Sequence, residues 1–188
     1  MPIAAITLDL DDTLWPFAPI ASHIDQVLDR WLRTHSPATA ERFPIPAMQQ
    51  LRERTWQAHP ELAHDLSALR RITLVAAFQA SGAPLELVQP AYEAFYAARN
   101  TVTFYDDALD ALQRIAARFP IAALTNGNAD LAAIGIDHLF AFQLGAREHG
   151  AAKPAPSIFH AACAQLGVPP AQVLHVGDHI ELAVAGAQ

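Results

Sequence analysis

The feature that most limits the fold of this chain is an alternation of short apolar runs with amphipathic segments. Four continuous apolar runs end in polar residues or glycine: residues 3–8, 120–127, 140–146 and 172–179. Such runs are typical of strands buried on both faces of a parallel sheet. Helical patterns lie between them, over residues 108–119, 130–140 and 155–167. The alternation predicts an α/β fold with a doubly wound parallel sheet and right-handed crossovers.

A long helical insertion follows the first apolar run. Apolar residues recur every three to four positions over residues 21–35, 48–59, 65–82 and 85–100, which predicts four helices. We therefore expect a core domain of residues 1–15 and 101–188 and an inserted all-helical cap domain of residues 16–100. Open α/β folds bind ligands at the carboxyl edge of the sheet, so we interpret the insertion as a lid. A packing appendage remote from any site is the alternative.

The composition favours chemistry on small molecules. The 188 residues are 52% hydrophobic, which is enough for a buried core, and carry a formal net charge of −7. This balance lacks the basic surface that nucleic acids or anionic membranes would require as partners. The single Cys163 is expected to be a reduced, buried thiol. Because the sequence shows neither a signal peptide nor a transmembrane helix, we expect a cytoplasmic protein. A monomer or a homodimer is expected, and the sequence does not decide between them.

Unusual polar residues gather where the predicted strands end. The carboxyl ends of parallel strands converge on one crevice, so residues distant in sequence are expected to share one pocket. One further residue, a lysine, precedes a predicted helix. The six residues are Asp9, Asp11, Thr125, Asn126, Lys153 and Asp178.

Clustered carboxylates in a partly desolvated cleft repel one another strongly unless a cation is present. Mg²⁺ is the expected cation, because it takes oxygen ligands, keeps several waters and pairs with substrate phosphate. It would need only one or two carboxylates, such as Asp9 and Asp178, and a backbone carbonyl. Together with Lys153 it would also neutralise the repulsion between a carboxylate nucleophile and an anionic phosphate.

Four motifs, DLDDTLW, LTNGN, KPAPSIF and HVGDH, occur in this order along the chain. In order and separation they resemble the four signature motifs of the haloacid dehalogenase-like hydrolase superfamily, from residue 3 to the C-terminus. The resemblance implies a Rossmann-like core, and the insertion resembles the helical cap that this superfamily places between its first two motifs.

The resemblance also implies roles for individual residues. Asp9 matches the nucleophile that forms an aspartyl-phosphate. Asp11 matches the general acid that protonates the leaving oxygen and then activates water. Lys153 matches the cation that steadies the nucleophile and the phosphoryl group.

The remaining roles concern the phosphate and the metal ion. Thr125 matches the phosphate-binding hydroxyl, with the backbone N–H of Asn126 nearby, although both residues could instead cap the following helix. Asp9, Asp178 and the backbone carbonyl of Asp11 match the ligands of Mg²⁺.

The acid at position 11 discriminates between reactions. Dehalogenases of the superfamily lack an acid two positions after the nucleophile, since halide leaves without a proton. Asp11 therefore favours phosphate ester hydrolysis or phosphomutase chemistry over haloacid dehalogenation, which is the less favoured alternative. Of the first two, we rank a phosphatase that acts on a small phosphorylated metabolite first. The motifs further resemble bacterial phosphatases that act on flavin mononucleotide and on the phosphorylated ribityl-aminouracil of riboflavin biosynthesis.

The fourth motif departs from the family pattern. A second acid usually follows four or five residues after the first, but Leu182 and Ala183 stand there, and Glu181 is the only acid nearby. We predict a weakened Mg²⁺ site unless Glu181 substitutes. The sequence also stops within a predicted helix, whereas similar family members continue. A truncated or degenerate, non-catalytic member that binds phosphorylated ligands or a protein partner is therefore a second alternative.

Three residues within the motifs keep open roles at this point. Trp15 could line the substrate entrance or wedge the lid against the core. His175 and His179 straddle a strand end, which disfavours a zinc site. His179 could touch the active site or cap the following helix.

Overall fold

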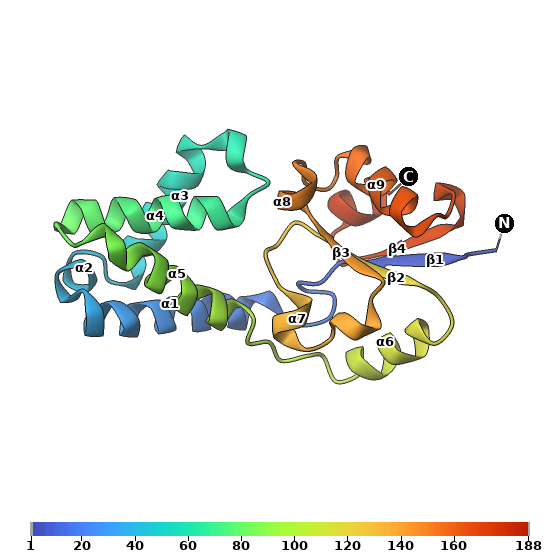
Figure 1. Cartoon of the computed structure of the whole chain (residues 1–188), viewed down its shortest axis with the longest axis horizontal. Helices are drawn as coiled ribbons and strands as arrows, with labels where there is room; N and C mark the ends of the chain where they lie inside the picture. Colours follow the sequence, from blue (N-terminus) through green and yellow to red (C-terminus); the bar gives the residue numbers. More distant parts are fainter. Residues whose placement is uncertain (1, 188) are drawn as a thin grey trace. The chain divides into compact units, whose positions relative to one another are not determined.

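The computed structural model describes residues 2–187. The chain divides into two compact units, Met1–Phe17 with Val102–Gln188, and Ala18–Thr101. Figure 1 shows the strands gathered in the first unit and the long helices α1, α3, α4 and α5 in the second. Among the residues described, no helix is long and apolar enough to cross a membrane.

The first unit is built on a four-stranded parallel sheet with the order β3-β2-β1-β4. Every residue of β1 and β2 is buried, as expected for central strands covered on both faces. The prediction of a doubly wound parallel sheet is confirmed. The strands are β1 (Ala5–Leu8), β2 (Ile121–Thr125), β3 (Phe142–Gly145) and β4 (Val173–Val176).

Helices flank the sheet, and Figure 1 shows α6 and α9 on opposite faces of it. On one face, Ile158 and Ala162 of α9 pack against Leu124 of β2, and all three side chains are fully buried. Proline in the first turn of α9 and left-handed Gly167 after it set its ends. The helices of this unit are α6 (Ala108–Ala116), α7 (Leu131–Ile134), α8 (Ala146–His149) and α9 (Pro156–Leu166), with the 3₁₀ turns η3 (Asp137–Leu139) and η4 (Pro170–Gln172) and the π-helical segment η5 (Ile180–Ala185).

The prediction of one helix over residues 130–140 was wrong. The carboxylate of Asp130 accepts hydrogen bonds from the N–H groups of Ala132 and Ala133 and starts α7. Gly135 then takes a left-handed conformation, with φ of 89°, and ends the helix after one turn. The remaining residues form the turn η3 and an extended segment. Gly135 thus ends the helix, although it lies inside an amphipathic pattern.

Every residue of the second unit lies in a helix or in a loop. Asp65 caps α4 by accepting a hydrogen bond from the N–H of Ala68, and left-handed Gly82 ends it. The fold class, a parallel sheet with an all-helical insertion, is confirmed, while the interpretation of the insertion as a lid stays a prediction. The elements are α1 (Phe17–His35), α2 (Pro37–Arg42), α3 (Ile45–Ala58), η1 (Pro60–Leu62), α4 (Leu66–Ser81), η2 (Leu85–Leu87) and α5 (Val88–Arg99).

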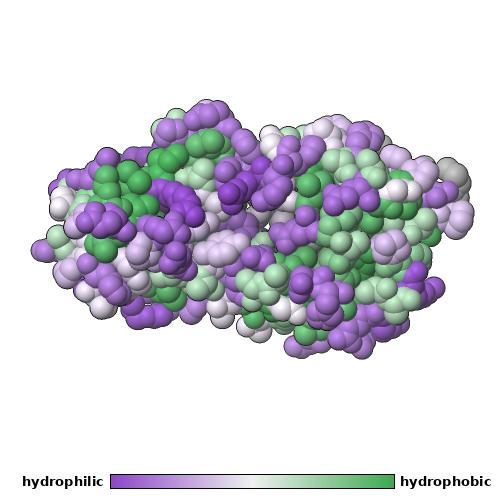
Figure 2. All heavy atoms as spheres, viewed as in Figure 1, coloured by the Kyte–Doolittle hydropathy of each residue, from purple (hydrophilic) through white to green (hydrophobic). Residues whose placement is uncertain are grey.

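Apolar side chains also reach the surface, as the green patches among purple residues in Figure 2 show. In the first unit the outer strand β4 and the segment after it contribute Leu174, Val176, Ile180 and Val184 to this exposed set. Cys163, on α9, is a buried free thiol as predicted, and burial raises its pKa.

Candidate active site

The centre of the site is an ion pair between two residues far apart in the sequence. Asp9 follows β1, and its N–H donates to the carbonyl of Val176, which holds the strand end in place. The Nζ atom of Lys153 lies 2.7 Å from Oδ2 of Asp9, while Oδ1 of Asp9 accepts a hydrogen bond from the N–H of Leu10. Both carboxylate oxygens thus have a partner, which fixes the orientation of the side chain.

Lys153 is the only lysine in the sequence, and it is only 2% exposed. Burial lowers the pKa of its ammonium group, and the negative charges of Asp9, Asp178 and Asp11 oppose that shift. A cation in such a place is weakly screened by water, so its attraction for an incoming anion is stronger than at the surface. The arrangement combines a carboxylate with a buried positive charge.

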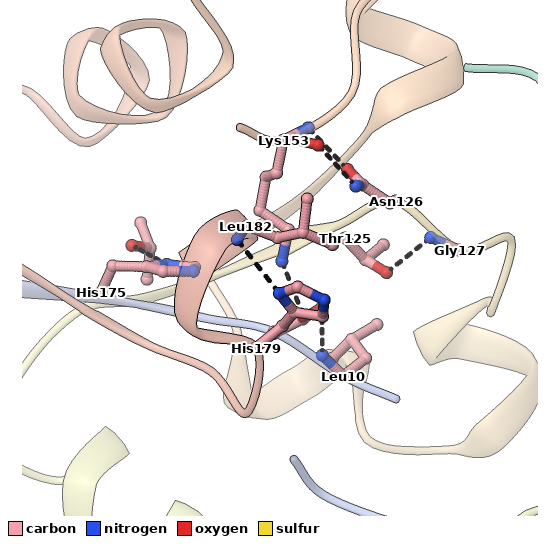
Figure 3. A network of polar contacts seen from close by, with 10 residues as sticks. Leu10, Thr125, Asn126, Gly127, Lys153, His175, His179 and Leu182 are labelled. Carbon is pink, nitrogen blue, oxygen red and sulfur yellow. Dashed lines mark hydrogen bonds and ion pairs between the residues drawn. The ribbon is translucent and has the colours of Figure 1, made fainter. Parts of the chain in front are cut away.

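The side chain of Asn126 holds the backbone of Lys153. Its Nδ2 donates to the carbonyl of Lys153 at 2.9 Å, and its Oδ1 accepts from the N–H of Lys153 at 2.7 Å. Figure 3 shows these two bonds side by side. Sequence reasoning considered only the backbone of Asn126 and missed this clasp. The two residues are 27 positions apart, so no local signal could have revealed it.

Thr125 ends β2 and is 1% exposed. Its Oγ1 accepts a hydrogen bond from the N–H of Gly127 at 2.9 Å, so the hydroxyl group keeps its own proton to donate. A buried hydroxyl group at a strand end is a suitable donor to an anionic oxygen. The phosphate-binding role of Thr125 stays a prediction.

Asp11 and Asp12 have different surroundings. Oδ1 of Asp11 accepts a hydrogen bond of 2.8 Å from the indole N–H of Trp15. Asp12 has a left-handed backbone, with φ of 56°, and its carboxylate accepts from the N–H of Phe17. Asp12 therefore stabilises the turn locally. Trp15 is fully buried, so its ring does not line an open entrance.

Asp178 follows β4, the neighbour of β1, and its side chain is exposed. A Cβ built on Gly177 would come within 3.2 Å of the Cβ of Asp9 and 2.8 Å of that of Ala183. Glycine thus lets the end of β4 pass close to the ion pair. The carboxylates of Asp9 and Asp178 and the carbonyl of Asp11 are hard oxygen donors, which fits Mg²⁺. In residues 2–187 no group of three or more His, Cys, Asp and Glu side chains is arranged to hold a metal ion.

Glu181 belongs to η5, which follows Asp178 in the chain. It lines a cavity of about 580 Å³ with His160, Cys163 and His175, whereas neither Asp9 nor Asp178 contributes to that lining among the residues described. His179 caps η5, because its Nδ1 accepts from the N–H of Leu182 (Figure 3). Neither residue is directed to the ion pair by these contacts.

Comparisons with known proteins agree with this geometry. Residues 3–188 match the family model described as haloacid dehalogenase-like hydrolase. The 5-amino-6-(5-phospho-D-ribitylamino)uracil phosphatase YigB of Escherichia coli (strain K12) is 31% identical, over 98% of this chain and 79% of that protein. The glyceraldehyde 3-phosphate phosphatase of Methanopyrus kandleri is 29% identical over the same shares of the two chains.

Solved structures show the same likeness. A 2-haloacid dehalogenase from Pseudomonas syringae pv. Tomato DC3000 superposes with a TM-score of 0.91 at 34% identity, covering 99% of this chain and 82% of that chain. The putative HAD-hydrolase YfnB from Bacillus subtilis has a TM-score of 0.69 at 16% identity, covering 100% and 85%, which shows the fold alone. The chain therefore belongs to the haloacid dehalogenase-like hydrolase family.

Proposed function

We propose that the protein is a Mg²⁺-dependent phosphatase that hydrolyses a small phosphate monoester through an aspartyl-phosphate on Asp9. The observation that carries the proposal is the ion pair of Asp9 with the buried Lys153. A carboxylate alone would repel a phosphate dianion. A cation held 2.7 Å from that carboxylate lowers the electrostatic barrier to attack on phosphorus.

The reaction has two displacements. In the first, an oxygen of Asp9 forms a bond to phosphorus, the bond to the leaving oxygen breaks, and Asp11 donates its proton to that oxygen. In the second, the Asp11 carboxylate takes a proton from water, whose oxygen attacks phosphorus, and the bond to Asp9 breaks. Lys153 and the Thr125 hydroxyl group stabilise the negative phosphoryl oxygens in both steps.

The metal site rests on the same strand ends. The carboxylates of Asp9 and Asp178 and the backbone carbonyl of Asp11 would hold Mg²⁺, with water completing its coordination. The ion supplies positive charge to the transferring phosphoryl group. The two strands involved, β1 and β4, are hydrogen-bonded neighbours, which supports placing ligands on both.

The substrate that we propose is flavin mononucleotide or the phosphorylated ribityl-aminouracil of riboflavin biosynthesis. The proposal is supported by 31% identity to YigB, whose name gives the latter compound. Since a relative of nearly equal identity is named for glyceraldehyde 3-phosphate, both classes belong in one panel. A cytoplasmic location and a monomeric or homodimeric state stay predictions.

The test is a panel of phosphorylated metabolites that includes flavin mononucleotide, assayed with Mg²⁺ for the parent chain and for Asp9→Asn. Asp110→Asn, at an exposed position of α6, is the matched control. We expect the control to keep parent activity and Asp9→Asn to lose at least about 1,000-fold, as for a missing nucleophile. Parent-like turnover by Asp9→Asn would refute the assignment, and ligand binding without turnover would favour a non-catalytic member.

Dehalogenation is the second candidate, because the dehalogenase structure from Pseudomonas syringae is 34% identical. The acid at position 11 speaks against it, since a halide leaves without a proton. Release of halide from 2-haloacids by the parent chain, with no phosphate release from the panel, would reverse the order of the two candidates.

A further inference from the structure

The loop after β1 closes on itself and brings an indole N–H to a carboxylate. Trp15 Nε1 donates to Oδ1 of Asp11 at 2.8 Å, and the N–H of Asp12 donates to the carbonyl of Trp15 at 2.8 Å. A bridge pairs the backbones of Asp11 and Trp15. An indole N–H has only this one polar function, and a buried one requires an acceptor.

The indole ring packs against the chain segment that begins the second part of the first unit, after residue 101. The ring of Phe104 meets it edge to face, with centroids 5.5 Å apart and an angle of 78°. The N–H of Tyr105 donates to the carbonyl of Leu14 at 3.0 Å, which ties that segment to the loop. Since Trp15 is fully buried, its ring has no room to turn away, and the N–H stays directed at Asp11.

We propose that Trp15 is a positioning residue for Asp11, which it orients as the acid that protonates the leaving oxygen. This inference rests on the proposed phosphatase function. An indole nitrogen donates and never accepts, and the unprotonated oxygen of a carboxyl group is its stronger acceptor. The acidic proton is therefore placed on Oδ2. The indole selects which oxygen faces the substrate and holds the carboxyl group at a fixed angle.

The dependence of the hydrolysis rate on the leaving group tests whether Trp15 positions Asp11. An alkoxide is a poor leaving group, so hydrolysis of an alkyl phosphate depends on the proton from Asp11. The 4-nitrophenolate ion leaves readily without a proton, so 4-nitrophenyl phosphate depends on it little. General acid catalysis contributes roughly 100-fold to 10,000-fold where it is needed. A mere loss of packing at Trp15 would lower both rates by the same factor.

The experiment compares kcat and KM for the two esters in the parent and in Trp15→Phe, which keeps a ring against Phe104 and removes the N–H. We expect kcat for the alkyl phosphate to fall about 10-fold more than kcat for 4-nitrophenyl phosphate, with similar KM values. Trp56→Phe, at an exposed position of α3, is the control and keeps both rates.

A second variant covers the case in which Trp15→Phe does not fold. Replacing Trp15 by benzothienylalanine, in a chain with Trp31→Phe and Trp56→Phe, exchanges the N–H for sulfur at nearly constant shape and should give the same selective loss. Equal loss for both esters, or no loss, overturns the positioning role.

Asp11→Asn separates this inference from the function on which it rests. If Asp11→Asn shows the selective loss and neither Trp15 variant does, the inference fails while the phosphatase function stands. If the parent hydrolyses neither ester, both fail.

Discussion

The buried Lys153 forms an ion pair with the partly exposed Asp9, with 2.7 Å between Nζ and Oδ2. Asn126 fixes the backbone of the lysine from the end of β2, and the hydrogen bond to Val176 fixes that of the aspartate from β4. Contacts at the ends of three neighbouring strands, β2, β1 and β4, thereby hold Nζ of Lys153 close to Oδ2 of Asp9. Such preorganisation is how enzymes stabilise charge without reorganising at the moment of reaction.

The first prediction concerns the titration of Lys153. Because burial lowers the pKa of its ammonium group, the side chain should titrate below the ordinary value of 10.5. Isotope-labelled lysine gives a single side-chain resonance, since the sequence has one lysine, and its chemical shift can be followed against pH. Asp9→Asn removes a negative charge that raises this pKa and should lower it further. A titration at or above the value of the unfolded chain would contradict the account.

The second prediction concerns the hydroxyl group of Thr125. Thr125→Val keeps the shape of the buried side chain and removes the hydroxyl, so we expect a loss in kcat/KM of roughly 100-fold. Thr125→Ser keeps the hydroxyl and should stay within about 10-fold of the parent. Steady-state kinetics on the best ester decides between them. Equal losses in the two variants would assign Thr125 to packing alone.

The third prediction is an acid-linked loss of stability through His175. Burial, with the charge of Lys153, lowers the pKa of His175 from 6.5 to about 4, and Thr7 Oγ1 is hydrogen-bonded to its Nδ1 at 2.9 Å. The unfolded chain takes up a proton below about pH 6.5 whereas the folded chain does not, so the free energy of unfolding falls between pH 6.5 and 4. The loss is at most about 3 kcal/mol, reduced by solvent screening at the partly exposed ring.

Urea unfolding at several pH values measures this dependence. His175→Gln should flatten it, and His138→Gln, at an exposed position, should leave it as in the parent. A parent-like slope in His175→Gln would show that other groups are responsible.

The fourth prediction concerns the strength of the metal site. With Leu182 and Ala183 where the family has an acid, we expect half-saturation of the rate well above micromolar Mg²⁺. Asp178→Asn should raise that concentration at least about 10-fold further, with Asp110→Asn unchanged. Half-saturation of the parent at micromolar metal would show that the missing acid does not matter, and an unshifted Asp178→Asn would remove Asp178 from the ligands.

Much of the fold could be predicted because the signals are local. The apolar run at residues 3–8 and the alternation of predicted strands and helices indicate a parallel sheet, even where the bounds of single elements are predicted inaccurately. The short helix α2 lies outside the four predicted helices, and it begins at Pro37, because proline is well tolerated in a first helical turn. The end of α7 at Gly135 was also missed. A glycine inside a helical pattern does not always end the helix, and the left-handed conformation that ends this one is visible only in the structure.

The site likewise contains residues that the sequence could predict and contacts that it could not. Strand ends pointed to Asp9, Thr125 and Asp178 from the sequence alone, since topology brings such ends to one edge. The clasp of Asn126 on Lys153 depends on how two loops meet, which no spacing encodes. Trp15 and Asp11 are only four residues apart, yet their contact depends on a left-handed turn at Asp12.

The central claim is that Asp9 carries the phosphoryl group during turnover. Acid quenching of the reaction with a phosphate-labelled ester, followed by peptide mapping, tests it most directly. We predict a label on the peptide that contains Asp9, released by hydroxylamine as expected of an acyl phosphate, and absent from Asp9→Asn. Turnover without any trapped label, or a label on another residue, would contradict the account.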